Sequence, residues 1–291
     1  MVREEILICG NVARDIILGE EYFGGSASVI ATNLKKLGVP AGVLSVIGND
    51  AFSKSYQDYL AGEGVGAELI TSPLKELPIC EVFSSDNVSS ARRWTDNGCR
   101  VAMTEMDFSL KQLENRYRII HLVGCPPELV AKFSDTTAAL SYDPGPRIIH
   151  DPAYINKNIL GRSKYMFAND EEMNAIQIAL GTNDPAEIVK NYQLEALIVT
   201  HGESGSVLYH KNGDKIEVSK IKSYSVDCVD PTGAGDAYRA GFLFGVTSGV
   251  PLKQACKFGS YLAALVVSQK GGILSEDNLI KFKNAIHGNT F

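Results

Sequence analysis

The segment from Asp230 to Asp236 holds the residues of this sequence that are best suited to chemistry. It reads Asp-Pro-Thr-Gly-Ala-Gly-Asp, is expected to follow a strand, and leads into a long apolar stretch of helical periodicity. Small residues ahead of a helix let backbone N–H groups converge, and the helix N-terminus adds the positive end of its dipole. The same dipole stabilises an ionised carboxylate at Asp236. Such a carboxylate can accept a proton from a hydroxyl while the loop stabilises a transferring phosphoryl group.

A helix cap is the simpler explanation of any single Asp-Gly turn, because Asp is a favoured N-cap residue and Gly and Pro form turns. Two aspartates that flank Thr-Gly-Ala-Gly favour a functional site instead. Other motifs fail: there is no P-loop, Tyr238 stands where a dinucleotide fingerprint needs its third glycine, and residues 202–205 miss the nucleophile-elbow pattern.

Strands and helices alternate along most of the chain, and they must position this loop. Apolar runs predict strands at residues 6–9, 43–47, 119–123, 165–168 and 197–200. Helical periodicity predicts helices at residues 26–37, 52–60, 128–140, 170–180 and 185–192. This alternation indicates an α/β fold with a mostly parallel sheet and helices on both faces. Ligands of such folds bind beyond the carboxyl ends of the strands.

The second half of the chain changes character. Residues 205–209 and 215–226 are predicted to form antiparallel strands joined at Asn212-Gly213, a strong hairpin signal. Residues 236–247 and 252–267 are almost free of charge, which predicts two helices buried against the sheet. Residues 79–101 are polar at their centre and strand-like at their ends, so we expect a projecting β flap there.

Composition limits the classes of protein. The 291 residues are 45% hydrophobic and carry 28 basic against 34 acidic side chains, a net charge of -6. An acidic chain without a basic block argues against a nucleic-acid partner. No apolar run approaches the roughly 20 residues of a membrane span, and the N-terminus lacks a secretory pattern. Six scattered cysteines without a CxxC pair fit a reducing cytoplasm.

The sequence resembles the ribokinase-like (PfkB) carbohydrate and nucleoside kinases. The stretch DPTGAGDAYRAGFL is similar to the C-terminal signature of that family, and four further segments resemble its other motifs in the same order: residues 24–38, 47–50, 169–172 and 200–205. The resemblance implies one three-layer α/β/α domain over residues 1–291, with a small β lid at about residues 16–24 and 79–101.

The resemblance also implies ATP as the phosphoryl donor, Mg²⁺, and roles for individual residues. Asp236 would be the catalytic base. The anion hole would be formed by Gly233, Ala234 and Gly235. The donor would be bound by Asn169, Thr200, Gly202, Gly205 and Thr232. Asn169 and Glu172 would organise Mg²⁺ through water, although Asn followed three residues later by Glu is also typical of a capping box. Asp230 and Thr232 would hold the monovalent cation, such as K⁺, that some members bind.

On the acceptor side, the resemblance assigns Asn11, Asp15, Gly24, Gly25 and Asp143. A carboxylate at Asp15 that accepts two vicinal hydroxyls suits a ribose or a polyol, whereas taken alone it would be read as an aspartate that caps a turn.

The sequence departs from the family pattern at two points. Val29 stands where many members have an acceptor-binding asparagine, and only eight residues, 16–23, separate Asp15 from Gly24. The family usually places a longer pair of flap strands there. We therefore expect looser acceptor selectivity, and a lid-to-lid homodimer stays open.

The acceptor is predicted to be a ribonucleoside that is phosphorylated at its 5′-hydroxyl. The reason is that the motifs of this sequence most resemble those of the archaeal nucleoside kinases of the family. Phe23 and Trp94 are candidates for stacking on a base. The alternative is a sugar or polyol such as ribose, fructose, 2-keto-3-deoxygluconate or myo-inositol. A non-catalytic binding protein and an oxidoreductase are less compatible, because Asp236 is retained and the dinucleotide fingerprint fails.

Overall fold

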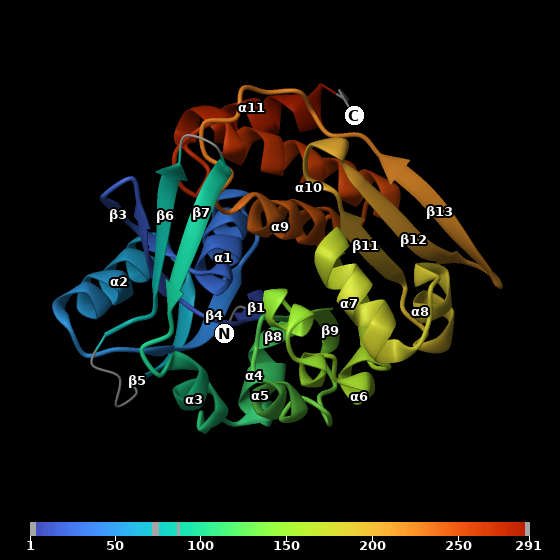
Figure 1. The fold of residues 1–291 in the computed structure, drawn as a ribbon, viewed down its shortest axis with the longest axis horizontal. Coiled ribbons are helices and arrows are strands. Elements are labelled where there is room, and N and C mark those ends of the chain that lie inside the picture. The colour runs from blue at the N-terminus through green and yellow to red at the C-terminus, as the bar shows by residue number, and fades with distance from the viewer. Residues whose placement is uncertain (1–3, 72–75, 86–87, 289–291) are drawn as a thin grey trace.

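The computed structural model describes residues 4–71, 76–85 and 88–288, and it is built around a nine-stranded sheet (Figure 1). The sheet order is β13 (Lys215–Ile221), β12 (Ser206–Asn212), β11 (Ala196–Thr200), β10 (Ser163–Asn169), β9 (Ala139–Asp143), β8 (Tyr117–Val123), β1 (Glu4–Cys9), β4 (Ala41–Ile47) and β5 (Gly66–Thr71). All pairs from β5 to β11 are parallel, and β12 and β13 add an antiparallel hairpin at one edge.

The order of the strands reverses at β1. The chain proceeds from β1 to β4 and β5 on one side, and then continues from β8 to β11 on the other. In sheets of this kind ligands bind at such a point, beyond the carboxyl ends of the strands. Asn11 follows β1 and Asp143 ends β9, so both lie at this edge of the sheet.

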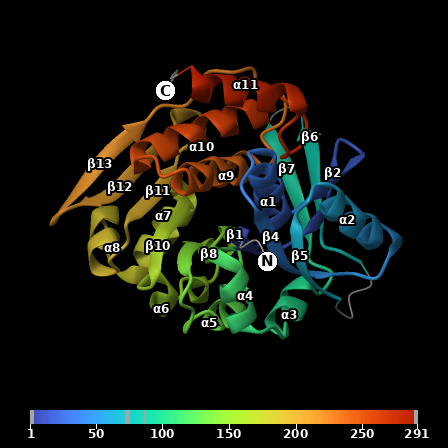
Figure 2. The ribbon, with the colours of Figure 1, turned by 180° about the vertical axis from the view of Figure 1, so that it is seen from behind.

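Helices cover both faces, giving three layers (Figures 1 and 2). One core contains residues of α1 (Ser26–Lys36), α2 (Ala51–Gly62), α9 (Ala234–Thr247), α10 (Leu252–Val267) and α11 (Glu276–His287). The opposite core contains residues of α3 (Cys99–Thr104), α4 (Leu110–Arg116), α5 (Pro127–Ala131), α6 (Lys157–Leu160), α7 (Asp170–Leu180) and α8 (Pro185–Asn191). Successive strand residues serve opposite cores: Ile6 and Ile8 belong to the first, and Leu7 belongs to the second.

A second, four-stranded sheet forms the lid. Its order is β3 (Glu20–Gly24), β2 (Ala13–Ile17), β6 (Ile79–Ser85) and β7 (Val88–Thr95). One face packs on α2, where Phe23 stacks on Tyr59 with ring centroids 4.5 Å apart and lies 5.2 Å from Phe52. The lid strands therefore cover the predicted lid segments up to Thr95, whereas the residues from Cys99 onward begin α3.

The predicted elements are largely confirmed, with two corrections. The predicted helix over residues 128–140 is wrong beyond Ala131, because α5 ends there and residues 139–143 form β9. After Ala131 the backbone continues in i→i+3 turns, and the Thr136 hydroxyl then accepts a hydrogen bond from the Ala138 N–H at 3.2 Å just before β9. The strand predicted over residues 215–226 ends at Ile221, so the Asp230 loop follows irregular backbone rather than a strand.

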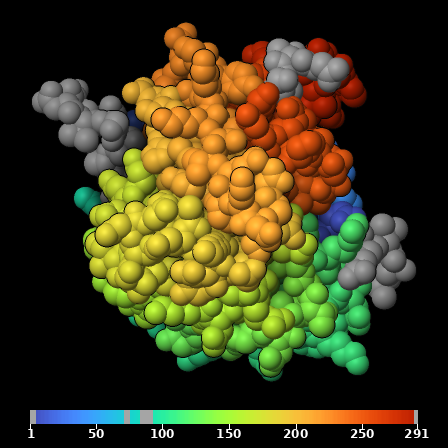
Figure 3. Space-filling view, turned by 90° about the vertical axis from the view of Figure 1, so that its right-hand side faces the viewer, coloured from blue at the N-terminus to red at the C-terminus, as the bar shows by residue number. Residues whose placement is uncertain are grey.

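The β12–β13 hairpin is confirmed, with Asn212 paired to Lys215 across its turn. In the side view the hairpin, in orange, lies above the yellow surface of α7 and α8 (Figure 3). At its base, Gly205 connects to β12 with φ +92°, and a Cβ there would lie 2.1 Å from the Ile221 carbonyl oxygen. Only glycine fits this turn without moving β13.

We predict that Gly205→Ala destabilises the protein more than Gly213→Ala. Both positions have positive φ, so each variant bears a strain of about 1–2 kcal/mol, but nothing lies within 4 Å of a Cβ at Gly213. Urea unfolding of the two variants measures the additional effect of the Ile221 clash. Equal losses would show that the turn at Gly205 relaxes freely.

Candidate active site

The Asp230–Asp236 loop is held by a buried carboxylate. Asp230 Oδ1 accepts from the Thr232 N–H and Oδ2 accepts from the Gly271 N–H, both at 2.9 Å. Gly233 is the N-cap of α9 with φ 77°, and a Cβ there would lie 2.5 Å from Gly272 Cα. The loop can therefore turn tightly only because glycines meet at this contact, which leaves its backbone N–H groups at the start of a fourteen-residue helix.

Thr232 lies inside this loop. Its Oγ1 is buried and has no hydrogen-bond partner among the residues that the structure describes. Asp230 and Thr232 were expected to hold a monovalent cation. Both carboxylate oxygens of Asp230 already accept hydrogen bonds from backbone N–H groups. Asp230 therefore stabilises the conformation of the loop.

Asp236 lies in the first turn of α9, at the edge of a charged cluster. Its Oδ1 is 3.5 Å from Nη1 of Arg239, which contacts Asp143 on the other side. Glu172, at the start of α7, is also buried and interacts electrostatically with Asp143 and Asp236. Sequence reasoning missed Arg239 as a member of the site, although it lies within the quoted motif, because nothing in a linear motif shows that β9 supplies its partner.

Glu172 and Asn169 form the reciprocal pair that the sequence pattern suggested. The Glu172 N–H donates to Asn169 Oδ1 and the Asn169 N–H donates to Glu172 Oε2, each at 2.8 Å. Burial, followed by repulsion from Asp143, raises the pKa of Glu172 to about 7, although Arg239 opposes the shift. The capping box is therefore real, and it also holds a carboxyl group inside the charged cluster.

A pocket of about 660 Å³ brings together three of the five predicted donor-binding residues, and its lining includes neither Asn169 nor Thr232. Thr200, Gly202 and Gly205 line it from the β11–β12 connection. Ala234 and Gly235 line it from the Asp230–Asp236 loop, hereafter called the anion loop after its predicted role. Further lining residues come from the backbone after β13 and from α10: Ser223, Tyr224, Ser225, Val226, Cys228, Ser260, Ala263, Ala264 and Val267. Sequence analysis did not identify these, and the small residues of α10 were the only signal that another group approaches there.

The predicted acceptor residues meet at the base of the lid. A Cβ on Gly24 would lie 2.0 Å from the Asp15 carboxylate, so this glycine lets Asp15 lie against the backbone. Gly25 has φ 87° and would clash with the backbone of residues 11–13 if it had a side chain. Asn11 accepts the Ala27 N–H through its carbonyl oxygen at 3.2 Å, which joins the first loop to the start of α1.

Asp15 belongs to a row of four lid residues, hereafter the lid row. It pairs with Tyr22 on β3 and with Cys80 on β6, and Cys80 pairs with Trp94 on β7. Directly paired residues share one face of a sheet, so these side chains lie on the same side. Phe23 lies on the opposite face among the aromatic rings of α2, so its predicted role in stacking on a base does not fit its position.

Tyr22 of the lid row lies near the α10–α11 connection, which supports the Asp230–Asp236 loop. A Cβ on Gly271 would lie 3.3 Å from the Tyr22 ring, and Gly271 precedes the Gly272 that contacts Gly233. Hydrogen bonding to Glu20, then burial, raises the pKa of the Tyr22 hydroxyl to about 12. Trp94 keeps 42% of its surface exposed, so part of the indole is available to a ligand.

Val29 does not replace asparagine as a ligand, because its side chain is buried and packs toward Gly272. Asn33, one turn later, holds the same loop. Its Nδ2 donates to the Gly272 carbonyl and its Oδ1 accepts from the Leu274 N–H, both at 2.9 Å. Helix α1 therefore supports the loop that contacts Gly233.

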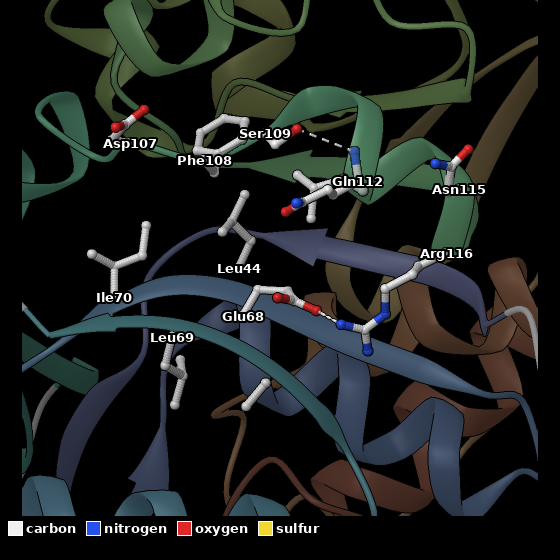
Figure 4. Close-up of a pocket in the computed structure, with 12 residues that line it drawn as sticks. Leu44, Glu68, Leu69, Ile70, Asp107, Phe108, Ser109, Gln112, Asn115 and Arg116 are labelled. Atoms are coloured by element: carbon white, nitrogen blue, oxygen red, sulfur yellow. Dashed lines mark hydrogen bonds and ion pairs between the residues drawn. The ribbon is translucent and has the colours of Figure 1, made fainter. Parts of the chain in front are cut away.

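A second pocket of about 560 Å³ lies between β5 and α4 (Figure 4). It contains none of the predicted site residues, and Glu68 and Arg116 pair with each other across it. Within the described residues no three His, Cys, Asp or Glu side chains gather closely enough to hold a metal ion on their own. Likewise, in that part of the chain every helix falls short of the length and apolar character that a membrane span requires.

An anion loop, a carboxylate beside it and a nucleotide-sized pocket, all at the carboxyl edge of this sheet, define a phosphotransferase of the ribokinase fold. The chain belongs to the pfkB family of carbohydrate kinases, whose model matches residues 18–279. It is therefore a phosphotransferase that acts on an alcohol group, and the family uses ATP, generally with Mg²⁺.

Three relatives illustrate the range of the family. The nucleoside kinase of Methanocaldococcus jannaschii is 30% identical over 269 residues, 90% of this chain and 84% of that protein. Its crystal structure matches with a TM-score of 0.80 over 96% of this chain and 98% of that one, at 26% identity. The cytidine kinase of Thermococcus kodakarensis is 25% identical, over 92% of this chain and 97% of that protein. The 5-dehydro-2-deoxygluconokinase of Clostridium tetani is 26% identical, over 85% and 79%.

We predict that Glu172→Gln stabilises the protein above pH 7, in the absence of nucleotide and metal. The pKa of Glu172 lies above its unfolded value of 4.5, so wild-type stability falls as pH rises from about 4.5 to about 7 and stays low above that. Glutamine carries no charge and can still accept from the Asn169 N–H. The gain over wild type should reach roughly 2–3 kcal/mol at pH 8 and shrink toward pH 5.

Chemical denaturation at both pH values tests this expectation. Glu171→Gln is the matched control, because Glu171 is exposed one position away and its removal leaves the buried cluster intact. A stability difference of Glu172→Gln that is the same at pH 5 and pH 8 would contradict the prediction.

Proposed function

We propose that this protein is an ATP- and Mg²⁺-dependent nucleoside kinase that phosphorylates the 5′-hydroxyl of ribonucleosides with broad base tolerance. The observation that carries the proposal is the position of Asp236 in the first turn of α9. It lies beside the Gly233–Gly235 loop, whose Ala234 and Gly235 line the same pocket as Thr200, Gly202 and Gly205. The proton acceptor and the donor pocket thus meet at one helix N-terminus.

The reaction follows from these positions. The Asp236 carboxylate accepts the hydroxyl proton, the hydroxyl oxygen forms a bond to the γ-phosphorus, and the bond from that phosphorus to the β–γ bridging oxygen breaks, releasing ADP. Backbone N–H groups of Gly233, Ala234 and Gly235 stabilise the charge on the phosphoryl oxygens. The helix dipole favours a negative charge in the first turn of α9, where Asp236 lies.

Asn169 and Glu172 are proposed to organise Mg²⁺, because oxygen donors of this kind match its preference. Each already forms a hydrogen bond to the backbone of the other, which favours contact through water over direct ligation. When bound, the ion neutralises phosphate charge. Thr232, with its unpartnered buried hydroxyl in the described structure, is proposed to face the donor phosphates.

The nucleoside acceptor is supported by the lid row and by the relatives. Asp15 suits the two vicinal hydroxyls of a ribose, and the exposed Trp94 on the same face offers a stacking surface for a base. Nucleoside and cytidine kinases from archaea are among the relatives.

A sugar or polyol acceptor is the alternative. Relatives that are 5-dehydro-2-deoxygluconokinases favour it, as does the buried Val29, which offers no hydrogen bond to an acceptor. We further propose a cytoplasmic protein, since all six cysteines are free. A homodimer is compatible with β3 and β7, which are the edge strands of the lid sheet.

An acceptor panel separates the two functions. We expect ADP release with several purine and pyrimidine ribonucleosides, and little with ribose, fructose, 2-keto-3-deoxygluconate or myo-inositol. Turnover with one free sugar or polyol alone would favour a sugar or polyol kinase instead. A turnover rate with one nucleoside that exceeds the rates with all others by orders of magnitude would contradict broad base tolerance.

Asp236→Asn should lower kcat by about 10²–10⁴-fold, the usual contribution of a positioned base, while ATP binding persists. Asp277→Asn, which removes a carboxylate from the first turn of α11, is the matched control and should keep wild-type turnover. Steady-state rates and nucleotide titration measure both effects. Near-normal turnover of Asp236→Asn would eliminate Asp236 as the base.

Asp15→Ala and Trp94→Ala should each raise the KM for nucleosides more than they lower kcat, because both side chains are proposed to hold the acceptor. Only Trp94→Ala should spare a free sugar, which offers no base to stack. Glu21→Ala is the control, since Glu21 lies on the lid face opposite Asp15. An unchanged nucleoside KM in both variants would show that the acceptor binds elsewhere.

A further inference from the structure

We infer that Arg239 is a positioning residue: its guanidinium, anchored by the buried Asp143, holds the Asp236 carboxylate in the orientation that receives the acceptor proton. The inference rests on the proposed function, because Arg239 can position a catalytic base only if Asp236 is that base. It also changes the expected role of Asp143 from contact with the acceptor to support of Arg239.

The geometry places Arg239 between two carboxylates. Nε donates to Asp143 Oδ2 at 2.5 Å, and Nη2 contacts the same oxygen. Nη1 lies 3.5 Å from Asp236 Oδ1. A Cβ on Gly235 would lie only 2.7 Å from Nη1, so the guanidinium folds back along the first turn of α9. One planar cation thus lies against the anion loop and the base together.

The anchor is rigid. Asp143 is fully buried at the end of β9, and its Oδ1 accepts from the Gly145 N–H at 2.8 Å. Its other oxygen is occupied by Arg239, so an acceptor cannot reach the carboxylate without displacing the guanidinium. A planar fork held at two donors leaves its third nitrogen in a defined place, which a flexible ammonium would not do.

The surroundings keep this cation in place. Burial would lower the pKa of Arg239, but Asp143 on β9, Asp236 on α9 and Glu172 on α7 raise it above its ordinary value. From β8, burial and then the charge of Arg239 lower the pKa of His121 to about 3, so this imidazole is neutral. Arg239 therefore stays charged, with its Nη1 near the Asp236 carboxylate.

A purely structural role is the competing explanation, in which Arg239 only neutralises the buried Asp143. The two roles separate in steady-state kinetics. If Arg239 positions the base, Arg239→Met should lower kcat by roughly 100-fold, as expected for loss of a preorganised group, with little change in the KM for ATP or nucleoside. Arg118→Met, at an exposed arginine on β8, should behave as wild type.

The paired variant Asp143→Asn with Arg239→Gln tests the competing explanation directly and avoids the unpaired buried charge that Arg239→Met leaves. It removes both charges of the ion pair and leaves a polar amide at each position. A positioning role predicts that kcat stays low in a protein that melts cooperatively near the wild-type temperature. Recovery of wild-type kcat would overturn the inference. Arg239→Lys should give an intermediate kcat, and full activity would also overturn the inference, because charge without the fork would suffice.

The proposed function fails in a different way. If Asp236→Asn keeps its turnover, Asp236 is not the base and the proposed mechanism falls. If Asp236→Asn is inactive but Arg239→Met retains wild-type kcat, only the role of Arg239 is wrong. Should Arg239→Met fail to fold, the paired variant and Arg239→Lys decide the question.

Discussion

The buried Asp230 carboxylate fixes the geometry on which the active site depends. One carboxylate joins Thr232 in the anion loop to Gly271 in the α10–α11 connection, and Asn33 of α1 holds the next residues of that connection. A segment near the beginning of the chain and two segments from its last quarter therefore meet at one turn. These hydrogen bonds fix the backbone that leads into the N-terminus of α9, the end of a helix that favours an anion.

The site then draws its two sides from different layers. The proposed donor pocket lies between the β11–β12 connection and α10, whereas Tyr22 of the lid row lies near the α10–α11 connection. Tyr22 lies against Gly271, so the lid and the anion loop share a contact. The lid and the loop before α9 are thus joined through one segment, the α10–α11 connection.

Four charged side chains lie together in the site, where burial makes charge unfavourable. Asp143, Glu172, Asp236 and Arg239 come from three elements and are largely withdrawn from water. Buried carboxylates of this kind reduce stability, and proteins retain them where function uses them. The raised pKa of Glu172 reflects this loss of stability, and Arg239 partly opposes the increase in that pKa.

Local chemistry in the sequence determined the alternating elements, the Asn212-Gly213 hairpin, the capping box at Asn169 and the anion loop with its carboxylate. These features depend on neighbours within a few residues, which a linear pattern contains. The tertiary structure alone decided that Phe23 packs on α2, that Trp94 shares a face with Asp15, and that Asp143 reaches Arg239. Strand pairing and side-chain contact join residues tens to hundreds of positions apart, and no local periodicity specifies which of them meet.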